Sequence, residues 1–147
     1  RPSATEHVDE VHGVDALPGL WPSADVVSIC LPLLESTRCI VDADAIALIK
    51  PDAVLIDISR GGVVDQAALA GALSSGQLRG AAIDVFETEP LPADSDLWGL
   101  ENTILTPHCS SVYDGWENKS AAMFSDNLAR YRRGESLRNI VDPDRGY

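Results

Sequence analysis

The segment Ile56–Asp65 constrains the fold more than any other part of this sequence. An apolar run leads directly into Arg60 and a glycine pair, and it is followed by Asp65, a residue type that often begins a helix. A strand, a tight turn and a helix in this order are typical of an open α/β sheet. Such sheets bind ligands beside the carboxyl ends of their strands, which is where this pattern places Arg60.

Two further segments repeat this layout of an apolar run closed by a polar group. Ala81–Pro90 carries Asp84 and Glu89, and Thr103–His108 ends on a histidine. Because the carboxyl ends of parallel strands meet at one edge of a sheet, the three segments deliver arginine, glutamate and histidine to the same region. The sequence therefore predicts a candidate catalytic group of Arg60, Glu89 and His108.

The apolar pattern predicts an α/β fold with four strands and three main helices. The expected strands are Ala24–Leu31, Ala53–Ile58, Gly80–Val85 and Thr103–Leu105. The expected helices run from Asp42 to Ile49, from Asp65 to Gly76, and from Asp114, with Glu117 in the capping-box position, to Gly134. Nearly continuous apolar strands joined by helices indicate a parallel sheet covered on both faces. The stretch between Val85 and Thr103 is expected to be an irregular loop over the strand ends.

Charge and hydropathy limit the possible partners. The formal net charge is −12, and an acidic surface repels phosphate backbones, so we expect no nucleic acid partner. No apolar run reaches the length of a membrane span, and Arg1–His12 is polar, unlike a signal peptide. We therefore expect no membrane partner and a cytoplasmic location.

The three cysteines are Cys30, Cys39 and Cys109. Their odd number and the lack of a C-x-x-C pair favour neither a disulfide framework nor a zinc site, so no metal is expected. Cys30 ends a predicted strand, and we expect it to be a small buried apolar group.

Four segments in order carry a family resemblance: ADVVSICLPLLESTR, IKPDAVLIDISRGGVVD, LRGAAIDVFETEPLP and NTILTPH. From Ala24 to about Asn139 the chain resembles the D-isomer-specific 2-hydroxyacid dehydrogenases. The resemblance implies the second half of their nucleotide-binding domain, a partial Rossmann-like, doubly wound parallel sheet over residues 1–134 with a tail at 135–147. The glycine-rich first βα unit and the separate substrate domain of that family have no counterpart in this sequence.

The resemblance also implies a role for individual residues. Arg60 matches the arginine that binds the substrate carboxylate, His108 matches the general acid/base, and Glu89 matches its carboxylate partner. Asp84 is similar to the aspartate that holds the nicotinamide carboxamide. The other implied cofactor-binding residues are Cys30, Leu31, Pro32, Thr37, Ile58, Ser59, Ser110 and Ser111.

Some positions depart from the family pattern. Asp57 stands where the family often has asparagine, and Ser110 and Ser111 stand where it often has glycine or alanine. Trp116 falls in a region where some relatives place a bulky group beside the substrate.

The implied activity is hydride transfer between NAD or NADP and a 2-keto or 2-hydroxy acid, in a homodimer. Without the glycine-rich turn and the substrate domain, we expect this chain alone to bind the cofactor weakly and to show little turnover. The choice between NAD and NADP is usually set at a strand that would precede Arg1. Arg1 or Ser3 beside the adenosine 2′ position would tolerate a phosphate there.

Simpler interpretations remain open. Arg60 could simply be an arginine on the surface, and His108 could have a structural role. Glu89 could be a solvated carboxylate, and Asp84 could only form a turn. A second class of function is a non-catalytic interaction module, corepressor-like or assembling through the sheet edge and the last helix. An acidic flavodoxin- or receiver-like domain is disfavoured, because the acidic cluster and late lysine of a receiver are missing.

Overall fold

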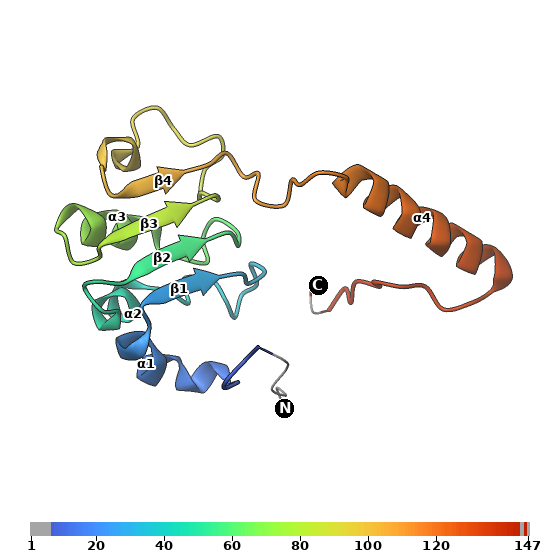
Figure 1. Cartoon of the computed structure of the whole chain (residues 1–147), viewed down its shortest axis with the longest axis horizontal. Helices are drawn as coiled ribbons and strands as arrows, with labels where there is room; N and C mark the ends of the chain where they lie inside the picture. The colour runs from blue at the N-terminus through green and yellow to red at the C-terminus, as the bar shows by residue number, and fades with distance from the viewer. Residues whose placement is uncertain (1–6, 145, 147) are drawn as a thin grey trace. The chain divides into compact units, whose positions relative to one another are not determined.

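The computed structural model describes residues 7–144 and 146 and divides the chain into two compact units, Arg1–His108 and Cys109–Tyr147. The first unit is built on a parallel sheet in the order β1-β2-β3-β4 (Figure 1). Its strands are β1 (Val26–Ile29), β2 (Val54–Asp57), β3 (Gly80–Ile83) and β4 (Thr103–Leu105). All four predicted strands are confirmed, and the first three are shorter at their ends than expected.

Two helices connect the first three strands, and both begin as the sequence predicts. Helix α2 spans Ala43–Leu48 and helix α3 spans Gln66–Ser74. The side chains of Asp42 and Asp65 accept hydrogen bonds at 2.9 Å from the backbone N–H groups three residues later. Each aspartate therefore satisfies one of the free donors at a helix N-terminus.

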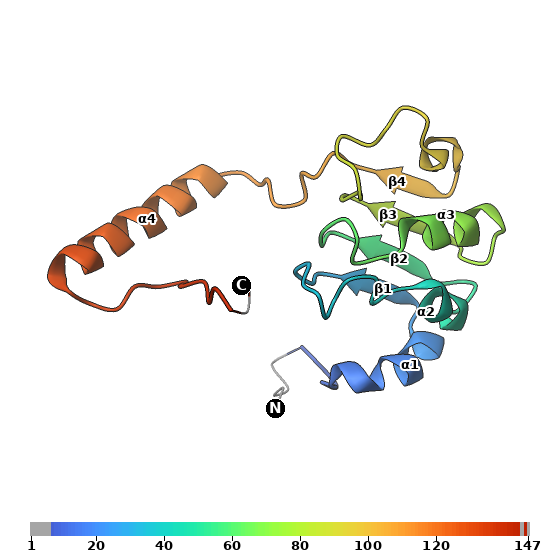
Figure 2. The ribbon, with the colours of Figure 1, turned by 180° about the vertical axis from the view of Figure 1, so that it is seen from behind.

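Both helices lie on the same face of the sheet, in front of it in Figure 2. The strands follow one another in space without reversing direction, and right-handed crossovers then place every connecting helix on one side. Within residues 7–108 the other face carries no helix, whereas we expected both faces to be covered. On that face Val26 is 56% exposed and Ile104 is 67% exposed.

The core of the first unit lies between the sheet and these two helices. Its largest fully buried side chains are Ile46, Leu55, Leu69, Leu78, Leu97, Val41 and Val63. The apolar residues on the helix-facing side of each strand alternate with partly or fully exposed residues along β1 and β2. This alternation shows that the sheet is packed on one side within this unit.

Three short helical segments precede β1 and were not expected from the sequence. They are η1 (Val14–Ala16), α1 (Leu17–Leu20) and η2 (Trp21–Ser23). None is long enough to establish an apolar periodicity, which is the signal that sequence analysis depends on. Tertiary packing holds these segments in place, because Trp21 is buried in the hydrophobic core.

The loop between β3 and β4 contains more regular structure than expected. A short 3-10 helix, η3 (Asp96–Gly99), follows Ser95, whose side chain accepts a hydrogen bond from the N–H of Leu97. Leu97 is buried in the core. One buried leucine therefore ties the loop to the body of the unit.

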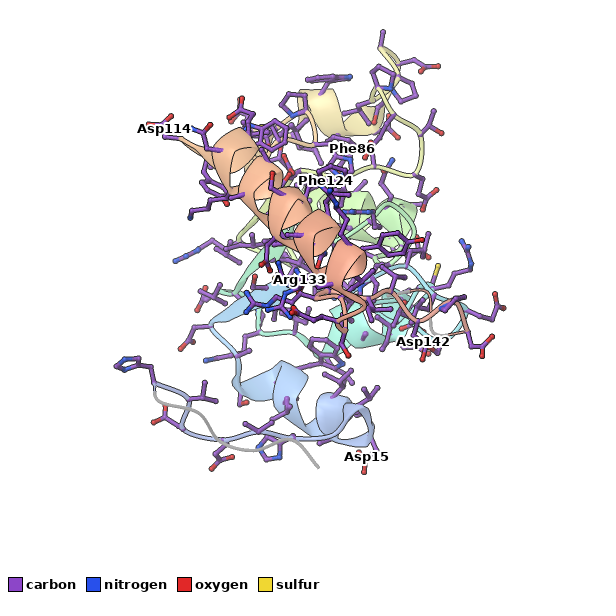
Figure 3. All side chains as sticks on the ribbon, turned by 90° about the vertical axis from the view of Figure 1, so that its right-hand side faces the viewer. Asp15, Phe86, Asp114, Phe124, Arg133 and Asp142 are labelled. Atoms are coloured by element: carbon purple, nitrogen blue, oxygen red, sulfur yellow. The ribbon has the colours of Figure 1, made fainter. Side chains whose placement is uncertain are left out.

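The second unit consists of helix α4 (Trp116–Arg133) and irregular segments around it. Figure 3 labels Asp114 and Arg133 near its two ends. The expectation that Asp114 caps this helix was wrong, because the N-cap is Gly115, with φ +84°, and it makes no side-chain capping hydrogen bond. The expected end at Gly134 is confirmed, in a left-handed conformation that suits glycine.

Gly61 marks the closest approach between the turn after β2 and the segment after β3. A Cβ at this position would lie 1.9 Å from the carbonyl oxygen of Phe86 and 2.7 Å from the backbone nitrogen of Glu87. Both atoms belong to the backbone, so they cannot swing aside as a flexible side chain would. Gly71 in helix α3 is different, since a Cβ there would meet nothing within 4 Å.

We expect Gly61→Ala to lower the free energy of unfolding by about 2 kcal/mol or more, because the added methyl group overlaps backbone atoms. Gly71→Ala is the matched control, and it should raise stability by roughly 0.5–1 kcal/mol as glycine leaves a helix interior. Urea denaturation measures both changes. Equal midpoints for the two variants would contradict this account of the turn.

Candidate functional site

The three residues of the expected catalytic group come together at the carboxyl ends of the strands. The Nδ1 atom of His108 lies 2.8 Å from Oε2 of Glu89, and its Nε2 atom lies 3.5 Å from Nη1 of Arg60. The strand register aligns Asp57 of β2 with Ile83 of β3, and Ile83 with Leu105 of β4. The segments that leave these aligned strand ends therefore bring distant parts of the sequence together.

Glu89 is held on two sides. Its Oε1 atom accepts a hydrogen bond from the N–H of Phe86 at 3.0 Å, while Oε2 faces His108. The hydrogen bond with His108, followed by that from Phe86, lowers the pKa of Glu89. Because the ionised carboxylate is an acceptor, it favours the imidazole tautomer that carries a proton on Nδ1 and leaves Nε2 facing Arg60.

The backbone at His108 is in an unusual conformation. Its φ is +53°, in the left-handed region, and its N–H donates to the carbonyl of Thr106 at 3.1 Å. This conformation is uncommon for residues other than glycine, and such residues cluster at functional sites. The turn after β4 therefore places the imidazole in the site through a backbone conformation that costs a modest amount of energy.

A buried carboxyl group lies behind Arg60. Asp57 is 3% exposed, and its Oδ1 atom accepts hydrogen bonds from the N–H and the hydroxyl of Ser59, at 3.0 and 2.5 Å. The Nη1 atom of Arg60 in turn donates to the carbonyl oxygen of Ser59 at 2.7 Å. Burial raises the pKa of Asp57, as does nearby Asp84, while the hydrogen bonds from Ser59 oppose the rise.

Asp84 occupies the equivalent place at the end of β3. It is 3% exposed, and its Oδ1 atom accepts a hydrogen bond from the hydroxyl of Thr106 at 2.5 Å. Thr106 begins the turn that carries His108. The structure thus places Asp84 beneath the His108 turn, and the expected contact with a nicotinamide carboxamide stays a prediction.

The other expected cofactor residues of the first unit follow β1 and β2. Leu31 is 38% exposed and Ile58 is 40% exposed, and the N–H of Ile58 donates to the carbonyl of Ile29 at 3.2 Å. Two exposed apolar side chains at neighbouring strand ends suit the faces of a flat ring. Cys30 is exposed, contrary to our expectation that it is buried, since it follows the last residue of β1 instead of lying within the strand.

The hydroxyl groups of Ser59 and Thr37, two of the expected cofactor-binding residues, form hydrogen bonds within their own loops. Ser59 is buried against Asp57. The Thr37 hydroxyl donates to the carbonyl of Pro32 at 2.6 Å and accepts from the N–H of Leu34 at 2.8 Å. Both side chains thus hold the loops that follow β1 and β2.

The remaining expected residues lie outside the first unit. Ser110 and Ser111 are exposed and, like Trp116, belong to the second unit, so they are described apart from the site. Arg1 and Ser3 lie outside the described residues.

An apolar hollow beside His108 was not foreseen from the sequence. Its volume is about 570 Å³, and its lining includes Phe86, Leu91, Trp98 and Leu105 together with Glu89 and His108. The indole N–H of Trp98 donates to the carbonyl of Pro92 at 2.8 Å, which folds the loop back on itself. In the sequence, the tryptophan and prolines between β3 and β4 were the only indication of this hollow. The tryptophan and one of these prolines line it only once the loop has folded.

The described residues contain neither a metal-binding group nor a membrane-spanning helix. No group of three or more histidine, cysteine, aspartate or glutamate side chains there is arranged to hold a metal ion. Across residues 7–144 no helix has the length and apolar character needed to cross a membrane.

The arrangement suits a small anion with an adjacent carbonyl or hydroxyl group. The planar guanidinium of Arg60 matches a carboxylate and keeps its charge at any ordinary pH. The imidazole of His108 can move a proton at Nε2, while Glu89 holds the ring at Nδ1.

Comparison with known proteins gives consistent matches. Residues 1–110 match the family model of the D-isomer specific 2-hydroxyacid dehydrogenase, NAD binding domain. A glyoxylate reductase of Korarchaeum cryptofilum is 38% identical over 141 residues, which cover 95% of this chain and 42% of the relative. The chain therefore spans less than half the length of this curated relative.

Solved structures agree with this match. A D-isomer specific 2-hydroxyacid dehydrogenase of Xanthobacter autotrophicus in complex with NADPH and MES is 41% identical, with a TM-score of 0.91, over 100% of this chain and 60% of that one. An NADPH-dependent glyoxylate/hydroxypyruvate reductase of Sinorhizobium meliloti, in complex with NADP and sulfate, is 30% identical with a TM-score of 0.90, over 100% of this chain and 48% of that one.

The raised pKa of Asp57 predicts a pH-dependent effect of Asp57→Asn. The folded chain holds this proton more tightly than the unfolded chain, so wild type loses stability as pH rises through the interval between the two pKa values. Asparagine does not titrate. The free energy of unfolding of the variant minus that of wild type should therefore increase as the pH rises above about 4, the ordinary pKa of an aspartate. Urea denaturation across this range tests it, and a difference independent of pH would contradict it.

Proposed function

The chain belongs to the D-isomer specific 2-hydroxyacid dehydrogenase family, and we propose that it supplies the catalytic side chains of an NAD- or NADP-dependent 2-keto acid reductase. The observation that supports this proposal is the contact series from Glu89 through His108 to Arg60, with distances of 2.8 and 3.5 Å. An anion site and a proton donor then lie within reach of one small substrate.

Each of the three side chains has a distinct part in the proposed reaction. Arg60 binds the carboxylate of the keto acid and orients the neighbouring carbonyl group toward His108. His108 donates a proton from Nε2 to the carbonyl oxygen, and takes it back when the hydroxy acid is oxidised. Glu89 fixes the orientation of the ring through its contact with Nδ1. The cofactor, when bound, supplies the hydride.

The cofactor is proposed to lie across the ends of β1, β2 and β3. Leu31 and Ile58 offer exposed apolar contacts there, and Asp84 lies at the next strand end. The carboxyl edge of a parallel sheet is the usual place for a nucleotide in such folds. The relatives from Xanthobacter and Sinorhizobium were solved with NADPH and NADP, which supports a cofactor of the NAD(P) type.

The activity of the isolated chain is a separate part of the proposal. The chain covers 42% of the glyoxylate reductase from Korarchaeum. We therefore propose that the isolated chain binds the cofactor weakly and turns over little substrate. Its substrates are proposed to be small 2-keto or 2-hydroxy acids, in line with the names of these relatives.

Assembly is a second candidate role. None of the described residues of the second unit is buried, and α4 exposes five large apolar side chains: Trp116, Met123, Phe124, Leu128 and Tyr131. Exposed apolar surface favours association with another polypeptide. This observation supports a homodimer, and it is equally compatible with a non-catalytic interaction module.

A fusion that supplies the unmatched remainder of the Sinorhizobium reductase tests the catalytic proposal. In this fusion we expect reduction of 2-keto acids with NADH or NADPH, and we expect His108→Ala to lower kcat/KM by about 10²–10⁴-fold through loss of the proton donor. His12→Ala is the matched control, because His12 also pairs with a glutamate, Glu10, at 2.8 Å.

The control distinguishes a catalytic histidine from any paired histidine. His12→Ala should leave kcat/KM within about twofold of the parent fusion. An active fusion that loses no activity on His108→Ala would refute the assignment of His108. A folded fusion that reduces no 2-keto acid would favour the interaction module.

A further inference from the structure

We propose that Asp57 is a positioning residue for this reaction: its side chain orders the Ser59–Arg60 turn and thereby holds the Arg60 guanidinium beside His108. The inference rests on the proposed function for the role of Arg60. It assigns to Asp57 an action through another residue, because Asp57 is buried and cannot itself meet a substrate.

The contacts form a continuous path from the buried carboxyl group to the imidazole. Asp57 Oδ1 accepts from the N–H of Ser59 at 3.0 Å and from its hydroxyl at 2.5 Å. The carbonyl oxygen of Ser59 accepts from Nη1 of Arg60 at 2.7 Å. The same Nη1 atom lies 3.5 Å from Nε2 of His108. Ser59 is therefore held from one side by Asp57, and it holds Arg60 on the other.

The path matters because Arg60 has few other restraints. It is exposed and lies at the tip of a turn, and its long side chain has many rotamers in solution. A bond to a carbonyl restrains the guanidinium only if that carbonyl is itself fixed. The two hydrogen bonds accepted by Asp57 set the orientation of Ser59, and so of the acceptor that Arg60 uses.

Asp57 is also joined to the strand that leads toward Glu89. Its backbone carbonyl accepts a hydrogen bond from the N–H of Asp84 at 2.9 Å, which continues the parallel ladder beyond β2. Gly61, on the other side of Arg60, lies against the backbone of Phe86. The turn is thus anchored at both ends to the segment after β3, with Arg60 between the two anchors.

The Oδ1 atom of Asp57 accepts both hydrogen bonds from Ser59. Substitutions that keep or remove this oxygen therefore test the proposal. Asparagine has about the same size and keeps an oxygen acceptor at that position, so Asp57→Asn should preserve the turn. Asp57→Ala removes the acceptor, which leaves the buried N–H of Ser59 unpaired and its hydroxyl with only the carbonyl oxygen of Arg60, at 3.5 Å. A role in positioning therefore predicts loss on the alanine substitution and rescue on the asparagine substitution.

The test uses NMR spectroscopy of the 147-residue chain with oxamate, a carboxylate bearing an adjacent carbonyl. Two quantities are measured: the heteronuclear NOE of the Arg60 Nε–Hε group, which reports its order, and the dissociation constant of oxamate. Wild type and Asp57→Asn should show an ordered Arg60 and similar affinity. Asp57→Ala should show a disordered Arg60 and at least about tenfold weaker binding, because the anion site is displaced.

Leu55→Val controls for lost stability alone, since Leu55 is fully buried in the same strand and makes no contact in this path. It should lower the melting temperature and leave both Arg60 readouts unchanged. An Arg60 that stays ordered in Asp57→Ala, with unchanged oxamate affinity, would overturn the inference. If Asp57→Ala does not fold, Ser59→Ala replaces it, and an equally ordered Arg60 in that variant would overturn the inference.

The two readouts separate this inference from the proposed function. Oxamate that binds without shifting Arg60 signals, or does not bind at all, would count against the carboxylate role of Arg60. The NOE would still decide whether Asp57 orders the arginine. A loss of order in Asp57→Ala and Leu55→Val alike would assign the effect to stability and overturn the positioning role.

Discussion

Alignment of the carboxyl ends of β2, β3 and β4 is the constraint on which the rest of the site depends. The register pairs Asp57 with Ile83 and Ile83 with Leu105, so each strand releases its following turn at the same level. The turns then pack closely enough that only glycine fits at position 61. His108 contacts both Glu89 and Arg60 because the segments that carry these residues leave the aligned strand ends close together.

Two buried carboxyl groups support this arrangement from below. Asp57 binds the turn that carries Arg60 through Ser59, and Asp84 binds the turn that carries His108 through Thr106. Each pairing satisfies a polar group that would otherwise be costly to bury. Hydrogen bonds thereby connect the turns that carry Arg60 and His108 to buried side chains.

Much of this could be predicted from the sequence, because local patterns carry the relevant information. Apolar runs located the strands, and Asp42 and Asp65 located two helix starts through their capping chemistry. The hollow beside His108 and the buried positions of Asp57 and Asp84 depend on long-range packing, which no local pattern encodes. The exposure of Cys30 and the start of α4 at Gly115 depend on where an element ends, which is the least determined part of any apolar pattern.

The most direct test of the account is a titration of the isotope-labelled chain with NADPH, followed residue by residue in amide correlation spectra. The account predicts weak but saturable binding, in the micromolar to millimolar range, with the largest shifts at Leu31, Ile58 and Asp84. Gly71, which lies inside helix α3 and outside the proposed cofactor contacts, should not shift. A folded chain that shows no saturable shift at the three strand ends would contradict the claim that this edge of the sheet is a cofactor site.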